Sequence, residues 1–226
     1  MKLLALESAT EHCSVALWRD GVLSCLQGPA HQAHSETLLP MIRNLLSDAG
    51  VDPLQLDAIA FGMGPGAFTG LRMACGVAQG LALGLEIPVV PVSTLLALAE
   101  GAGHERVVAA LDARMNQIYV AAYEFIAGQW ITHITPCLSD PDPLPQLPDG
   151  VWLPVGSGAE LCSSALTQAW PGQLLPVKSG LIPQAIHVAT LGVKAFQSGL
   201  AMPPEQAAPL YLRDKVALTR AERAAK

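Results

Sequence analysis

FGMGPGAFTGLR, residues 61–72, joins a buried-strand pattern that ends at Phe61 to a long apolar helix pattern that begins near Thr69. Glycine permits positive φ and close approach of another backbone, and Pro65 stiffens the turn. A strand, a glycine loop and a helix N-terminus together suit either an anion or a second segment of backbone. The stretch predicts a strand–loop–helix unit and leaves these two uses of its loop open.

As a nucleotide signal this loop is weak. It lacks the Gly-Lys-Ser/Thr ending of a P-loop, and its glycines do not fall in the GxGxxG register. The helix N-terminus still favours negative charge, with Thr69 expected to cap it and Arg72 beside it. The candidate nucleotide or anion residues are Ser8, Thr10, Gly64, Gly66, Thr69 and Arg72.

The helix that follows the loop carries Gly76, Gly80 and Gly84 at four-residue spacing, which places them on one face. Each glycine costs a helix roughly 1 kcal/mol relative to alanine. Such a cost indicates that another helix packs very close to this face. The expected neighbour is either the helix over residues 35–49 or a partner protein, and the sequence does not choose between them.

The order of expected elements repeats along the chain. Strands at 3–6, 13–18 and 22–27, a helix at 35–49, a strand at 57–61, a helix at 69–85, a strand at 89–92 and a helix at 94–101 make the first set. Strands at 107–111, 117–125 and 129–135, a proline-rich surface loop at 136–148, a strand at 151–155 and helices at 159–170 and 186–198 make the second. We therefore expect two similar α/β lobes, 1–103 and 104–226, with a tail that can pack back on the first lobe.

Composition narrows the class of protein. Hydrophobic residues make up 51% and charged residues 14% of the 226 residues, which suggests that a partner covers part of the surface. The net charge of −6 argues against a protein that holds nucleic acid alone, and the basic stretch 213–226 is expected to be a solvated tail. Five widely spaced cysteines without CxxC and no signal-peptide pattern point to the cytoplasm, and residues 71–92 predict a buried helix and a strand, not a membrane span.

Three polar groups have both a chemical and a structural interpretation. The carboxylate of Glu7, after the first strand, suits either a metal–phosphate or a tight turn. His31 and His34 lie too close in sequence for the usual helical metal pair, so a helix cap is favoured. Residues 112–116 contain an Asp–Arg pair, for which a side-chain-stabilised turn is favoured over catalysis. No metal site, cofactor or catalytic residue is predicted.

Several colinear segments resemble the bacterial TsaB (YeaZ) family. They are LALESATEHCSVALW (4–18), HSETLLP (34–40), GPGAFTGLR (64–72), ALDARMNQIY (110–119) and YLRDKV (211–216). The resemblance implies the ASKHA fold of two ribonuclease-H-like lobes. It also implies a non-catalytic scaffold for N6-threonylcarbamoylation of adenosine 37 in ANN-decoding tRNAs, paired with the catalytic paralogue TsaD and the ATPase TsaE. From the residues themselves we expect a homodimer when the partner is absent and, given the negative net charge, at most indirect or weak contact with tRNA.

The chain departs from the resemblance at points that matter for chemistry. It has no HxxxH, the metal motif of the catalytic paralogue. Glu7-Ser8-Ala9 stands where the family often has Asp-Thr-Ser, and Ala67 where serine is common, so two hydroxyls are missing. The rival functions are an ATP-dependent small-molecule kinase of the same fold, with nucleotide between the lobes, and, further away, a glycoprotease-type metallopeptidase.

We expect the TsaD contact on the two helices of the first lobe. The apolar side chains there, and the small residues that let another backbone approach, suit an interface. The predicted interface residues are Leu38, Leu39, Ile42, Leu45, Leu46, Met73, Gly76, Val77 and Gly80.

Overall fold

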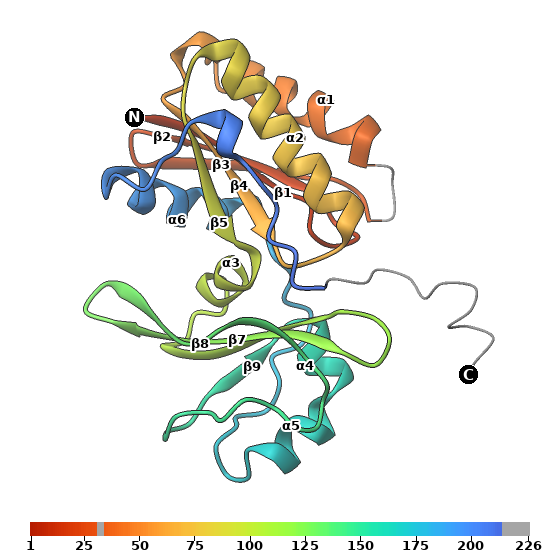
Figure 1. The fold of residues 1–226 in the computed structure, drawn as a ribbon. Coiled ribbons are helices and arrows are strands. Elements are labelled where there is room, and N and C mark those ends of the chain that lie inside the picture. The colour runs from red at the N-terminus through yellow and green to blue at the C-terminus, as the bar shows by residue number, and fades with distance from the viewer. Residues whose placement is uncertain (31–33, 214–226) are drawn as a thin grey trace, which may run out of the picture.

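The computed structural model describes residues 1–30 and 34–213. It holds two mixed β-sheets flanked by helices, which lie one above the other in Figure 1. The predicted interpretation of His31 with His34 and that of the basic tail beyond Arg213 fall outside what the structure describes.

The first sheet has five strands in the order β3-β2-β1-β4-β5. They are β1 (Lys2–Glu7), β2 (Ser14–Arg19), β3 (Val22–Gln27), β4 (Ala58–Gly64) and β5 (Val89–Ser93). The first three form an antiparallel meander, and β4 and β5 continue the sheet parallel to β1. Each strand lies where the sequence predicts it, within a few residues.

Both faces of this sheet are buried. Leu4 and Leu6 of β1 belong to a core cluster with α1 (His34–Asp48) and α2 (Phe68–Leu85). They share one face of the sheet because successive side chains of a β-strand point to opposite faces. Leu3 and Ala5 point the other way, into a cluster with α6 (Ala185–Gln197). A continuous apolar run such as β1 is what a strand covered on both faces needs.

The second sheet repeats the first with one strand fewer. Its order is β8-β7-β6-β9, with β6 (Arg106–Asp112), β7 (Ile118–Ile126) and β8 (Gln129–Ser139) antiparallel and β9 (Leu153–Val155) parallel to β6. Beside β9, two isolated parallel bridges, Trp152 to Leu174 and Val155 to Lys178, stand where a fifth strand would lie. The predicted repeat is confirmed for the strands, a three-stranded meander followed by a parallel strand. The last helix predicted for the second set, 186–198, is α6, which packs on the first sheet instead.

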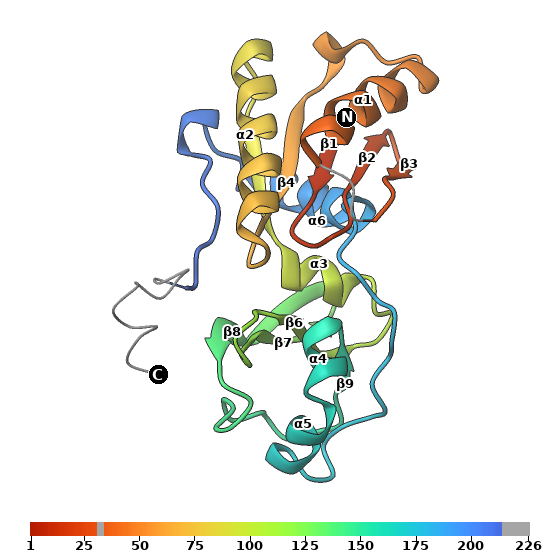
Figure 2. The ribbon, with the colours of Figure 1, turned by 90° about the vertical axis from the view of Figure 1, so that its right-hand side faces the viewer.

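Two helices each pack on the sheet that the other half of the chain forms. The short helix α3 (Thr94–Glu100) places Leu95 and Leu98 in the core under the second sheet, whereas α6 covers the first sheet. The other face of the second sheet is covered by α4 (Ser157–Leu161) and α5 (Ser163–Ala169). Short 3-10 turns lie at Pro53–Gln55 and Pro204–Gln206. The C-terminal part of the chain thus returns to the first lobe (Figure 2).

Two predicted elements differ from the structure. The predicted loop at 136–148 is wrong at its start, because β8 continues through Pro136 to Ser139; β8 is an edge strand, where a proline is tolerated. The predicted helix 159–170 is broken at Cys162, whose φ of −108° and ψ of 22° are not helical. Cys162, Leu166 and Trp170 remain buried on one side, so their spacing cannot reveal the break.

Helix α2 is, among the described residues, the one helix long and apolar enough to span a membrane by length and composition. Core helices of ordinary globular proteins pass the same test. Its buried residues include Ala74, Ala78 and Ala82, which pack against the first sheet. The helix and the strand predicted for residues 71–92 are present, but the prediction of a buried helix is only partly right. Of α2, 33% is buried, and Gly76, Gly80 and Leu83 are exposed.

Candidate functional site

The glycine loop between β4 and α2 packs against the chain that leaves β1. A Cβ on Gly70 would lie 1.8 Å from the carbonyl oxygen of Ser8, and one on Gly66 would lie 2.5 Å from that of Ala9. The Ala67 amide donates to the Ala9 carbonyl at 2.7 Å. Gly66 in the loop and Gly70 in the first turn of α2 therefore serve the close approach of another backbone, which is one of the two uses left open by the sequence.

The buried carboxylate of Glu7 lies beside this glycine loop. Glu7 is almost completely buried, accepts a hydrogen bond from the Ala9 amide at 2.7 Å, and accepts another from the Thr94 hydroxyl at 3.2 Å. Thr94 in turn accepts from the Gly64 amide at 3.1 Å. A Cβ on Gly62 would lie 2.0 Å from the Glu7 carboxylate. The glycine loop is thus built around Glu7.

The burial of Glu7 changes its acidity. Removal from water raises the pKa of this carboxyl from 4.5 to about 7, against the lowering effect of its hydrogen bonds with the backbone and Thr94. Both of its oxygens accept hydrogen bonds from neighbouring residues of this chain, Ala9 and Thr94. This agrees with the tight-turn interpretation of the segment.

The remaining candidate anion residues are divided by the structure. Thr10, Gly66 and Arg72 line one cleft, whereas the buried Ser8 donates its hydroxyl to the Gly70 carbonyl at 2.8 Å. Gly64 has a φ of +107° and faces Leu71. Thr69 does not cap α2: the cap position is Ala67, and it has no side-chain hydrogen bond.

Arg72 is held by aromatic side chains. Its guanidinium carbon lies 3.8 Å from the centre of the Phe68 ring, and its Nε donates to the Tyr211 hydroxyl at 2.9 Å. The two rings are 5.2 Å apart. Tyr211 was missed as a site residue; its only signal in the sequence is that YLRDKV, which begins with it, is one of the motifs of the family resemblance.

The cleft has a volume of about 910 Å³ and separates the two lobes. The first lobe contributes the loop after β1 and the start of α2, and the second contributes the β6–β7 turn and Ser157. Residues 210–213 line it as well. In the β6–β7 turn, Asp112 accepts from the backbone amide of Arg114 at 2.7 Å and from its guanidinium at 3.1 Å. This Asp–Arg pair stabilises its own turn, as the local chemistry favours.

The predicted interface residues on α1 need correction. Leu38, Ile42, Leu45 and Leu46 are each at most 5% exposed, because they belong to the core under the first sheet. Their apolar stripe is explained by this chain's own core and not by a partner. Leu39, in contrast, is 51% exposed.

The predicted residues on α2 lie at the surface. Met73 and Val77 are half-buried, and Gly76 and Gly80 are exposed. A Cβ on Gly76, Gly80 or Gly84 would meet nothing within 4 Å. The glycine face of α2 therefore does not pack against α1, and of the two neighbours that the sequence allowed, the one within the chain is excluded.

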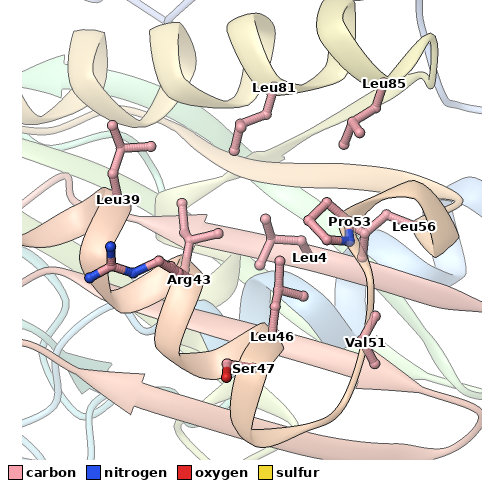
Figure 3. A pocket seen from close by; sticks show the side chains of 11 residues that line it. Leu4, Leu39, Arg43, Leu46, Ser47, Val51, Pro53, Leu56, Leu81 and Leu85 are labelled. Atoms are coloured by element: carbon pink, nitrogen blue, oxygen red, sulfur yellow. The ribbon is translucent and has the colours of Figure 1, made fainter.

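Two hollows accompany this face. One, of about 410 Å³, lies between α1 and α2 and is almost entirely apolar. Figure 3 shows Leu81 and Leu85 pointing from α2 toward the side of α1 that carries Leu39 and Leu46. The other, of about 400 Å³, is lined by Phe68, Thr69, Arg72, Met73, Gly76 and Val77. We use the name α2 surface for these two hollows together with the exposed Gly76, Gly80 and Gly84.

Within residues 1–30 and 34–213 no group of three His, Cys, Asp or Glu side chains is arranged to hold a metal.

Known proteins resemble this chain over most of its length. The family model described as "TsaD: tRNA N6-adenosine threonylcarbamoyltransferase" matches residues 28–220. A curated tRNA threonylcarbamoyladenosine biosynthesis protein TsaB from Escherichia coli is 38% identical, over 96% of this chain and 96% of the relative. A TsaB protein from Haemophilus influenzae is 35% identical, over 96% and 95%.

A solved structure supports the fold. YeaZ from Pseudomonas aeruginosa is 39% identical, covers 93% of this chain and 99% of its own, and superposes with a TM-score of 0.86. Together with the two mixed sheets flanked by helices, this likeness confirms the predicted ASKHA-type fold.

Proposed function

Because the chain belongs to the TsaB (YeaZ) family, we propose that it is a non-catalytic scaffold subunit in N6-threonylcarbamoylation of adenosine 37 of ANN-decoding tRNAs. Its role in tRNA threonylcarbamoyladenosine biosynthesis, as a protein related to TsaD, follows from the family. The scaffold acts by holding TsaD, and TsaE joins the complex. It works in the cytoplasm, and its contact with tRNA is weak or indirect.

The α2 surface carries this proposal. Gly76 and Gly80 are exposed above open space, although each costs the helix about 1 kcal/mol relative to alanine. Gly76 lines a hollow together with apolar side chains, among them Met73 and Val77. A partner helix that packs on this face would bury the hollow and use the close approach that glycine allows.

The polar side chains that could act in catalysis or bind phosphate are instead hydrogen-bonded within the fold, which supports the non-catalytic part of the proposal. Glu7 accepts from Ala9 and Thr94, Ser8 donates to Gly70, and Asp112 holds Arg114 in its own turn. Gly66 and Gly70 lie against backbone, in the place where an ATP-dependent kinase would present its loop to phosphate. No observation favours the kinase or the metallopeptidase.

Replacement of Gly76 by leucine tests the interface. The change adds a large side chain where the monomer has free space and removes a glycine from the helix, so the chain itself should stay folded. Gly76→Leu is expected to abolish co-purification of TsaD with the tagged chain. Because the scaffold would then fail, threonylcarbamoyladenosine in the tRNA of cells that carry only this variant is expected to drop, as measured by mass spectrometry of digested tRNA.

Gln168→Leu is the matched control, since it places a new leucine on the exposed face of α5, in the second lobe. It should keep both TsaD and the modified nucleoside at the normal level. Circular dichroism must be the same for the two variants. Undiminished co-purification of TsaD with a folded Gly76→Leu chain would refute the α2 surface as the interface.

A further inference from the structure

The lobe junction is built around α3. On one side this helix packs against α6 and β4, and on the other it packs against β6 and β7. The hydroxyls of Ser93, which caps α3, and Tyr123 on β7 lie 3.3 Å apart. A rotation of one lobe against the other would therefore turn about α3, and would open or close the inter-lobe cleft.

Two peripheral contacts oppose such a rotation, and the first is the β7–β8 hairpin. Trp130 donates from its indole nitrogen to Glu100, the last residue of α3, and packs on the core clusters of both lobes. Phe125 lies 5.4 Å from the ammonium group of Lys194 on α6. This contact is aromatic and partly buried.

The second contact is the segment Leu210–Arg213, which we call the strap. The Leu210 amide donates to the Met63 carbonyl at 2.7 Å, and Tyr211 accepts from Arg72, so its first half is fixed to the first lobe. Arg213 reaches the second lobe and donates to the Ala113 carbonyl at 3.0 Å. Figure 2 shows this part of the chain descending beside α2 toward the second lobe.

The part of the second lobe that the strap holds is the β6–β7 turn. Arg114, Met115 and Asn116 have φ values of +64°, +55° and +59°, a left-handed conformation that is uncommon for residues other than glycine and is least favourable here for Arg114 and Met115. Arg213 lies against this turn, with its guanidinium also 3.3 Å from the Met115 sulfur. The turn and the strap therefore support each other across the cleft.

We propose that the strap is a releasable latch between the lobes. Its contacts are a few hydrogen bonds, the ring contact of the exposed Tyr211 with Phe68, and the packing of the half-buried Leu212 on the core of the second lobe. The hairpin contact places two aromatic side chains, Phe125 and Trp130, at the junction. Each end of the strap raises the effective concentration of the other end at its own lobe, so loss of one contact weakens the second. When the strap dissociates from the second lobe, the two lobes rotate relative to each other about α3, and the inter-lobe cleft widens on the side where the strap was bound.

Hydrogen exchange on the full chain, read by mass spectrometry with residue-level fragmentation, tests the latch. Arg213→Ala removes a contact with the second lobe only, and is expected to speed exchange of the Leu210 amide, which is bonded to the first lobe, by about tenfold. Tyr211→Phe removes a contact with the first lobe only while keeping the ring. It is expected to speed exchange of the Ala113 and Gln117 amides, which close the β6–β7 turn in the second lobe, by a few-fold.

Arg19→Ala is the matched control. Arg19 also donates from its guanidinium to a backbone carbonyl, that of Ala49, but both residues lie in the first lobe and away from the strap. Neither reporter should change in this variant. If Arg213→Ala changes exchange only in the second lobe, or Tyr211→Phe only in the first, the strap does not couple the lobes and the proposal is wrong. This test needs no partner protein, so it is independent of the proposed interface with TsaD.

Discussion

Glu7 is the residue whose chemistry the fold changes most. Its carboxyl lies under the glycine loop, and burial raises its pKa to about 7. A carboxyl with a raised pKa holds its proton more tightly in the folded chain than in the unfolded one, where the ordinary value is 4.5. Between about pH 4.5 and 7 the folded state therefore binds more protons, and the contribution of Glu7 to stability falls as the pH rises.

We expect Glu7→Gln to remove this pH dependence. The amide imitates the protonated carboxyl, so the difference in unfolding free energy between the wild type and the variant should change by roughly 3 kcal/mol from pH 4.5 to 8, at 1.36 kcal/mol per pH unit. The wild type loses relative stability as the pH rises and the change levels off above pH 7. Urea titrations at several pH values measure it. Glu11→Gln, at an exposed position in the segment after β1, should keep the wild-type slope. Parallel curves for Glu7→Gln and the wild type would contradict the prediction.

At the scale of elements, α2 carries two kinds of glycine. Gly70 faces the chain after β1 and has no room for a side chain, whereas Gly76 faces open space. Both lie inside one helix, six residues apart. The first is needed by this chain's own packing, and the second is left for something outside it.

Alanine at each position separates the two cases. Gly70→Ala would bring a methyl group against the Ser8 carbonyl and should lower the unfolding free energy by about 3 kcal/mol or more. Gly76→Ala should raise it by up to about 1 kcal/mol, because alanine is the better helix former and meets nothing. Denaturant unfolding of both variants measures these changes. Equal effects at the two positions would mean that Gly70 does not pack on the segment after β1 as described.

At the scale of the whole molecule, the α2 surface is also our proposed contact for a homodimer of the isolated chain. A self-complementary apolar patch is the common basis of two-fold dimers. Sedimentation velocity at micromolar concentration is expected to find a dimer for the wild type and a monomer for Gly76→Leu. A dimer that persists in Gly76→Leu would place the homodimer contact on another face, and a wild type that stays monomeric would remove this proposal.

The sequence by itself determined the order of elements, the two-lobed repeat and the family. These follow from local signals: the apolar alternation of β1 and β2, the turn at Arg19–Gly21, the left-handed Gly50 after α1, and motifs such as GPGAFTGLR. It also gave the favoured interpretation of Asp112 as part of its own turn. Such features depend on neighbours along the chain, and the chain order carries them.

Only the tertiary structure decided which apolar and small residues are covered. Leu38 and Leu39 are neighbours in one helix, yet one is 1% and the other 51% exposed. Gly70 and Gly76 are the same residue type in one helix, and they differ only in what lies opposite them. Arg72 meets Tyr211, which is 139 residues away, and the strap connects both lobes. Contacts of this kind are made between segments far apart in the chain, so no local pattern encodes them.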